Sequence, residues 1–129
     1  MGYKKKKTVV IVEKTKTGYS AYAEDDAIFS TGKDIVTLHR NLLEAFRLAY
    51  EESGVHVAPD DLCLRLDLKQ FFRYYKVLNA NFLAKRIGMN PTLLSQYVRG
   101  KKQPSAKQLD KILLGIQSIG RELAALQLV

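Results

Sequence analysis

Polar side chains gather at helical spacing in the second half of this 129-residue chain. Four of them share the outward face of a helix expected over residues 91–98. They are Thr92, Ser95, Gln96 and Arg99. Hydroxyl, amide and guanidinium groups of this kind can hydrogen-bond to the edges of DNA bases. The chemistry that this pattern offers is recognition of a nucleic acid.

The residues before this face have the types that two steeply crossed helices require. Ala84 is small enough for the crossing point, and Gly88 tolerates the positive φ of a tight turn. Asn90 can cap the second helix, and Pro91 suits its first turn, where a missing N–H costs nothing. The pattern therefore predicts a helix-turn-helix over residues 83–102.

The segment that follows, residues 99–105 (RGKKQPS), resembles the continuation of phage-repressor helix-turn-helix domains. The resemblance implies a compact helical domain, whose helix from Pro91 enters the major groove while Lys101 and Lys102 lie near phosphates. The expected DNA-binding residues are Asn81, Asn90, Thr92, Ser95, Gln96, Arg99, Lys101 and Lys102. The alternative is a helical hairpin that binds no DNA.

The formal net charge of +8 is distributed unevenly along the chain. Residues 8–60 carry five basic and nine acidic side chains, a net charge of −4. Residues 61–129 carry twelve basic and four acidic side chains, a net charge of +8, and the lysine run at residues 4–7 adds +4. We expect a polyanion as the partner of the second half, and a basic or neutral partner for the first.

Hydropathy patterns predict a β-β-β-α-β unit in the first half. The β-branched segment 8–12 reads as a strand buried on both faces. The remaining elements are strands at 19–23, 27–31 and 62–68, and a helix at 34–53. After residue 67 the period becomes helical, and the expected helices are 67–78, 80–87, 91–98, 105–114 and 118–127. The fold class is thus α+β, with a sheet domain at residues 1–66 and an all-α domain at residues 67–129.

The first half is similar to HicB antitoxins in three segments, residues 18–22 (GYSAY), 29–34 (FSTGKD) and 41–46 (NLLEAF). In that family, a degenerate ribonuclease-H-like sheet binds and blocks HicA, a small basic mRNA-cleaving toxin, and a DNA-binding domain follows. The resemblance implies the same order here. The expected toxin-binding residues are the acidic loop Glu24, Asp25 and Asp26, since an acidic module suits a basic toxin.

The sequence favours neither an enzyme nor a metal or cofactor site. The expected strands carry only Glu13 and Asp67, too few acids for two-metal nuclease chemistry. His39 is expected at the surface. The single cysteine, Cys63, excludes an intrachain disulfide and a cysteine metal cluster. A signal peptide and a membrane span are not expected, so we expect the protein in the cytoplasm.

Together these patterns predict an antitoxin that neutralises a small mRNA-cleaving toxin and represses its own operon by binding operator DNA. Two alternatives stay open, a transcription regulator with a ligand-sensing N-terminal domain and a metal-dependent nuclease. We also expect at least a homodimer, because one recognition helix reads only half of a paired site. We expect the dimer contact to be formed by the apolar residues Ile116, Ile119, Leu123, Leu126 and Leu128.

Overall fold

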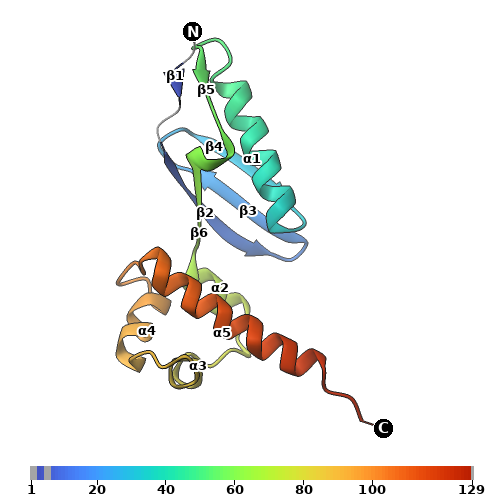
Figure 1. Ribbon diagram of the computed structural model, residues 1–129, viewed down its shortest axis with the longest axis vertical. Coiled ribbons are helices and arrows are strands. Elements are labelled where there is room, and N and C mark those ends of the chain that lie inside the picture. The colour runs from blue at the N-terminus through green and yellow to red at the C-terminus, as the bar shows by residue number, and fades with distance from the viewer. Residues whose placement is uncertain (1–2, 5–6, 129) are drawn as a thin grey trace. The chain divides into compact units, whose positions relative to one another are not determined.

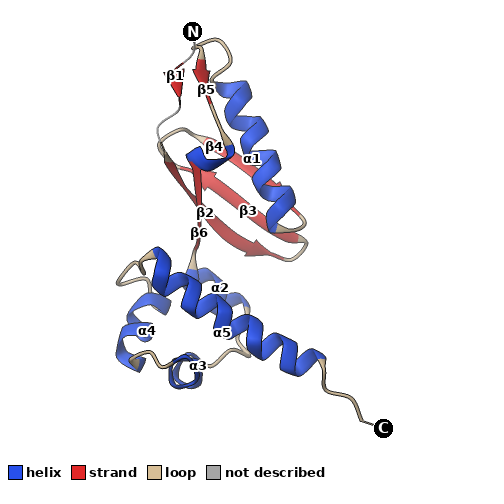
Figure 2. Cartoon of the chain, viewed as in Figure 1, coloured by secondary structure: helices blue, strands red, loops and turns tan. Residues whose placement is uncertain are grey.

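The computed structural model describes residues 3–4 and 7–128, and part of the lysine run lies outside this range. The chain divides into two compact units (Figure 1), an N-terminal unit that ends at Phe71 and a C-terminal unit that begins at Phe72. The boundary falls inside helix α2 (Leu68–Tyr74). The α+β class is confirmed: Figure 2 shows strands in the first unit and helices in the second.

The N-terminal unit is built on a mixed four-stranded sheet with the order β4-β3-β2-β6. Its strands are β2 (Thr8–Thr15), β3 (Gly18–Ala23), β4 (Ile28–Gly32) and β6 (Leu62–Leu66). Strands β2, β3 and β4 form an antiparallel meander, and β6 pairs in parallel with β2. The expected order of three strands, a helix and a strand is therefore confirmed.

Helix α1 (Ile35–Ala49) covers one face of this sheet (Figure 1). It begins at an Asp34 cap, whose carboxylate accepts a hydrogen bond of 2.7 Å from the amide of Thr37. Leu38, Leu42 and Phe46 lie one helical turn apart and are fully buried in the core of the unit. The expected helix to residue 53 is four residues too long, because the chain turns at residues 50–54.

The opposite face of the sheet is open to solvent within the described chain, which contradicts the expectation that residues 8–12 are buried on both faces. Val10 is fully buried under α1, whereas its neighbour Val9 is 42% exposed. Tyr22 and Phe29, which pair across β3 and β4, are 39% and 64% exposed. The reason is that α1 supplies a layer on one side only. We call Val9, Ile11, Tyr22 and Phe29 the open sheet face.

Two short strands and a 3-10 turn were not expected from the sequence. Strand β1 (Tyr3–Lys4) pairs in parallel with β5 (Val55–His56) in a separate ladder. The turn η1 (Pro59–Asp61) leads into β6, and the Asp61 carboxylate accepts a hydrogen bond of 2.7 Å from the amide of Ala58. Of these elements, β5 and η1 lie on the connection from α1 to β6, whereas β1 precedes β2.

The C-terminal unit packs α3 (Ala80–Ile87), α4 (Pro91–Val98) and α5 (Ala106–Ala124) around a small core. The bounds of α3 and α4 agree with the expected helices. The core residues are Leu83, Ala84, Met89, Leu94, Tyr97 and Ile112. Helix α2 is shorter than expected and ends at Tyr74 rather than near residue 78.

The two terminal helices expected at 105–114 and 118–127 are one continuous helix, α5, so the predicted break is wrong. Gly115 lies within α5, where α5 packs against α3. A Cβ at this position would collide with Cγ2 of Ile87 and lie 3.1 Å from Cδ1 of Leu83. The glycine therefore serves a helix–helix contact and does not end the helix.

Candidate nucleic-acid interface

The turn between α3 and α4 has the geometry that its glycine predicted. Gly88 ends α3 with φ 69° and ψ 32°, in the left-handed region. The amide of Met89 then donates a hydrogen bond of 2.9 Å to the carbonyl of Ala84. A Cβ on Gly88 would meet no atom within 4 Å, so backbone conformation rather than space requires the glycine. This turn fixes the angle at which α4 leaves α3.

Asn90 caps α4, as expected. Its side-chain oxygen accepts hydrogen bonds from the amides of Thr92, at 2.8 Å, and Leu93, at 3.4 Å. Pro91 occupies the first turn, where its missing N–H leaves no bond unmade. Asn90 was also expected to bind DNA. Because its oxygen is engaged in the cap, only its amide nitrogen remains for that contact.

Helix α4 separates an apolar side from a polar side. Leu94 is fully buried and Tyr97 is 7% exposed, while Thr92 and Arg99 are exposed. Ser95 and Gln96 are half-buried rather than fully outward. The structure thus places three of the four expected residues in α4 and the fourth, Arg99, at its C-cap, and Ser95 and Gln96 are the less exposed pair.

Arg99 is tied to the helix that precedes it. Its Nε donates a hydrogen bond of 3.2 Å to Oγ of Ser95, one turn earlier in α4. A guanidinium held through Nε still presents its two terminal nitrogens to a partner. Ser95 therefore orients Arg99, a relationship that residue spacing alone allows but does not require.

The basic loop after α4 is held by backbone hydrogen bonds. Gly100 has φ 74°, and the amides of Lys101 and Lys102 both donate to the carbonyl of Gln96, at 2.9 and 3.3 Å. The side chains of both lysines are exposed. Ser105 then caps α5 by accepting a hydrogen bond of 3.2 Å from the amide of Gln108. The backbone of both lysines is thus held beside the end of α4, and their charged side chains extend from there into solvent.

Helix α3 carries one expected contact residue and one cap that was missed. Asn81 is exposed in the first turn of α3. The cap is Asn79, whose side chain accepts a hydrogen bond of 3.0 Å from the amide of Phe82. An asparagine directly before a helical pattern is the signal that identifies such a cap. Arg86 also bears a charge, but it forms an ion pair with Glu122 on α5.

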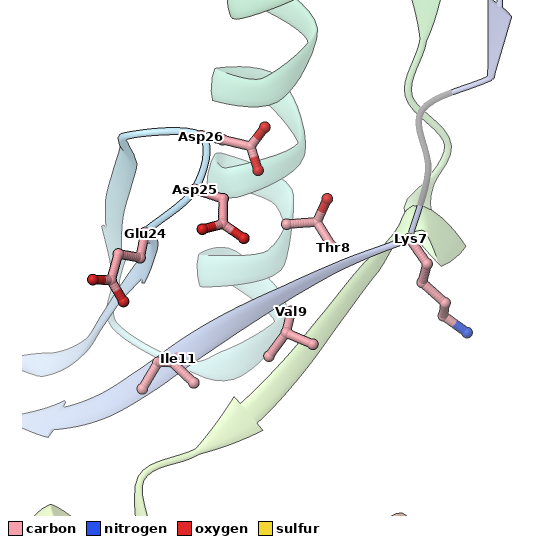
Figure 3. A pocket seen from close by; sticks show the side chains of 7 residues that line it. All are labelled: Lys7, Thr8, Val9, Ile11, Glu24, Asp25 and Asp26. Carbon is pink, nitrogen blue, oxygen red and sulfur yellow. The ribbon is translucent and has the colours of Figure 1, made fainter.

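The expected toxin-binding residues lie in the turn between β3 and β4. Glu24 and Asp25 are exposed, and the Asp26 carboxylate accepts a hydrogen bond from the Tyr50 hydroxyl. Figure 3 shows all three acids on the turn beside β2. They line an open groove of about 470 Å³. The groove is also lined by Lys7, Thr8, Val9 and Ile11. The acids therefore border the open sheet face.

The remaining sequence expectations concern His39, metal binding and a membrane span. His39 is half-buried and its Nε2 lies 3.2 Å from the carbonyl of Pro59. Among the described residues, no three His, Cys, Asp or Glu side chains gather as a metal ion would require. Within the same residues, none of the helices is both long and apolar enough to cross a bilayer.

Comparison with known proteins gives a match within the C-terminal unit. Residues 78–117 match the helix-turn-helix family model HTH_3, and the match spans α3, α4 and the first part of α5. No curated protein and no solved structure matches the chain. Residues 78–117 are thus similar to helix-turn-helix domains, and this similarity supports DNA binding by the C-terminal unit.

Proposed function

We propose that this protein is a repressor that reads an operator with α4 and whose N-terminal unit binds a small basic toxin, so that it acts as an antitoxin. The DNA-binding part of the proposal rests on one observation. The polar side of α4 ends in Arg99 and is followed by Lys101 and Lys102, whose backbone amides are fixed to that helix.

Within this site, two kinds of contact are expected. Thr92 and Gln96 lie along α4, where side chains of a recognition helix reach base edges in the major groove. Lys101 and Lys102 lie in the loop beyond α4, where an ammonium group meets phosphate. Sequence recognition would come from the first pair, and most of the salt-dependent affinity from the second.

Paired half-sites require a dimer, and α5 offers a contact for one. A stripe of apolar residues with spacings of four, three, four and three residues begins in α5 and ends just beyond it. It comprises Ile112, Ile116, Ile119 and Leu123 within the helix, and Leu126 after its C-cap. Ile112 is fully buried, whereas Leu123 and Leu126 are 66% and 74% exposed. The stripe thus continues from the core of the unit to the exposed end of α5, and we propose that the same region of a second copy packs against it.

The antitoxin role rests on the resemblance to HicB and on the surface of the N-terminal unit. Four apolar residues of the open sheet face are bordered by the acidic turn at residues 24–26. An apolar surface with an acidic rim suits a partner that is both basic and partly apolar. A toxin docked there would be inhibited sterically, because the antitoxin covers its active surface.

A ligand-sensing regulator is the second candidate, and a second groove favours it. An open groove of about 690 Å³ lies at the other end of the sheet. Hydroxyl groups dominate its lining, which includes Thr15, Thr17, Ser20, Thr31 and Thr37. A small polar molecule would find many hydrogen-bond partners there.

Two experiments test the proposal. Selection of DNA from a random pool should enrich two half-sites about 34 Å apart; no enrichment would contradict the repressor role. Co-expression with the products of the neighbouring genes should yield a stable complex with a small basic protein and relieve its toxicity. A chain that purifies alone and loses or gains DNA affinity with a small molecule would support the ligand sensor instead.

A further inference from the structure

Four charged side chains form a row on the outward side of α1. They follow one another at steps of four, three and four residues, as Arg40, Glu44, Arg47 and Glu51. Glu51 lies in the turn that continues α1, where its amide donates to the carbonyl of Leu48 at 3.4 Å. All four line one shallow groove together with Leu43 and Leu48. We call these four residues the charged row.

The charged row faces away from the core. Leu38, Leu42 and Phe46 occupy the opposite side of the helix and are fully buried. Arg47 is anchored, because its Nε donates a hydrogen bond of 3.1 Å to the carbonyl of Val57. In the part of the chain that the structure describes, neither Glu44 nor Glu51 takes part in an ion pair. The carboxylates are therefore available to a partner.

The order of charges along the row is self-complementary. From residue 40 to residue 51 it reads plus, minus, plus, minus, and the spacing is the same in both directions. A second α1 that runs antiparallel, related by a two-fold axis, sets Arg40 against Glu51 and Glu44 against Arg47. The two-fold axis repeats each pair. A parallel copy in register would set like charges against one another, so the row selects the antiparallel arrangement.

Apolar side chains flank the charged row. Leu43 and Leu48 lie on its two sides at equal distances in sequence from its centre, and Leu48 is 67% exposed. Exposed ion pairs contribute little affinity, whereas they set orientation and partner choice. Burial of the two leucines from each copy would supply the apolar part of the contact.

We propose that α1 is a self-association surface, which pairs two copies of this chain through the antiparallel charged rows. The contact belongs to the N-terminal unit and needs neither DNA nor the α5 contact. A chain with two separate two-fold contacts can join more than two copies, which would link DNA-binding units that belong to different α5 dimers.

The test uses the full chain with Leu123→Asp and Leu126→Asp, which remove the contact proposed on α5. This background is expected to remain a dimer by sedimentation velocity and native mass spectrometry. Two variants are then made in this background. Arg40→Glu with Arg47→Glu makes all four charges of the row negative, and Glu44→Arg with Glu51→Arg makes them all positive. Each of these one-sign variants is expected to be a monomer. Lys16→Glu with Lys33→Glu is the matched control for the first variant, because it makes the same change of net charge outside the row.

Two further results distinguish charge pairing from general destabilisation. An equimolar mixture of the two one-sign variants is expected to form a heterodimer. The fourfold variant, which exchanges all four signs, restores the alternation and is expected to dimerise again. If a one-sign variant fails to fold by circular dichroism, Leu48→Ser serves in its place and is expected to weaken the dimer. A monomeric background, a one-sign variant that still dimerises alone, or a mixture without heterodimer would overturn the proposal.

Discussion

The Nε of Arg99 donates a hydrogen bond to Oγ of Ser95, one turn earlier in α4, at 3.2 Å. This bond joins two residues that sequence reasoning treated as independent DNA contacts. It makes Ser95 a positioning residue for Arg99, and the two side chains should act as one group when α4 binds DNA.

A double-mutant cycle tests this coupling. Ser95→Ala is expected to weaken operator binding by about 1 kcal/mol, the usual net value of one hydrogen bond. In an Arg99→Ala background the same change should have almost no effect, because the group that Ser95 orients is gone. Isotherms of the four proteins on one operator measure the coupling. If the losses of binding free energy from the two substitutions were additive, Ser95 would contact DNA independently of Arg99.

The contact of Gly115 with α3 leads to a stability prediction. Gly115→Ala places a methyl group against Ile87 and should lower the free energy of unfolding of the C-terminal unit by about 1 to 3 kcal/mol. Gly120→Ala is the control, since a Cβ there meets no atom within 4 Å, and it should stabilise α5 by up to about 1 kcal/mol. Urea unfolding followed by circular dichroism measures both. Equal effects of the two substitutions would refute the packing role of Gly115.

Asp34 links the stability of the N-terminal unit to pH. The amide of Thr37 donates to its carboxylate, and this bond holds the pKa of Asp34 below its ordinary value of 3.8. A lowered pKa means that the stabilisation is complete above the ordinary value and is lost as the pH falls through the folded-state value. Urea midpoints of the wild type and Asp34→Asn, measured from neutral to acid pH, should therefore converge at low pH. If the difference between the two urea midpoints stayed constant over this pH range, the charge of Asp34 would not contribute to the cap.

The acidic turn provides a test of the partner proposed for the N-terminal unit. Asp26 accepts a hydrogen bond from Tyr50, so Glu24 and Asp25 are the better pair to change. Glu24→Lys with Asp25→Lys should slow association with a basic toxin and weaken the salt dependence of that rate. Affinity for operator DNA should stay unchanged. Equal losses of toxin and DNA binding would contradict the division of roles between the two units.

The features predicted most accurately from the sequence are those that depend on residues close together in the chain. The bounds of α3 and α4 follow from Gly88 and Asn90, whose conformational and capping roles act within a few residues. The order of the sheet elements followed from hydropathy. What failed depends on distant contacts. The break predicted between residues 114 and 118 is absent, and Gly115 in that segment packs against Ile87 of α3.

The exposure of the open sheet face also depends on contacts that are distant in sequence. The β-branched run of β2 is compatible with burial on one face or on both, and only the number of covering layers decides. A single helix, α1, covers the sheet in the N-terminal unit, so Val9 is exposed while Val10 is buried. The bond between Arg99 and Ser95 likewise depends on a rotamer that spacing does not specify.

The central claim is that α4 reads DNA sequence, and one comparison tests it most directly. Gln96 lies in the middle of α4, and Lys102 lies in the loop beyond it. Binding isotherms of Gln96→Ala and Lys102→Ala should be recorded on the selected operator and on random DNA, at two salt concentrations. Gln96→Ala should cost about 1 to 3 kcal/mol on the operator and little on random DNA. Lys102→Ala should weaken both and reduce the salt slope by about one unit. Equal losses on both DNAs from Gln96→Ala would show that α4 is not the reading helix.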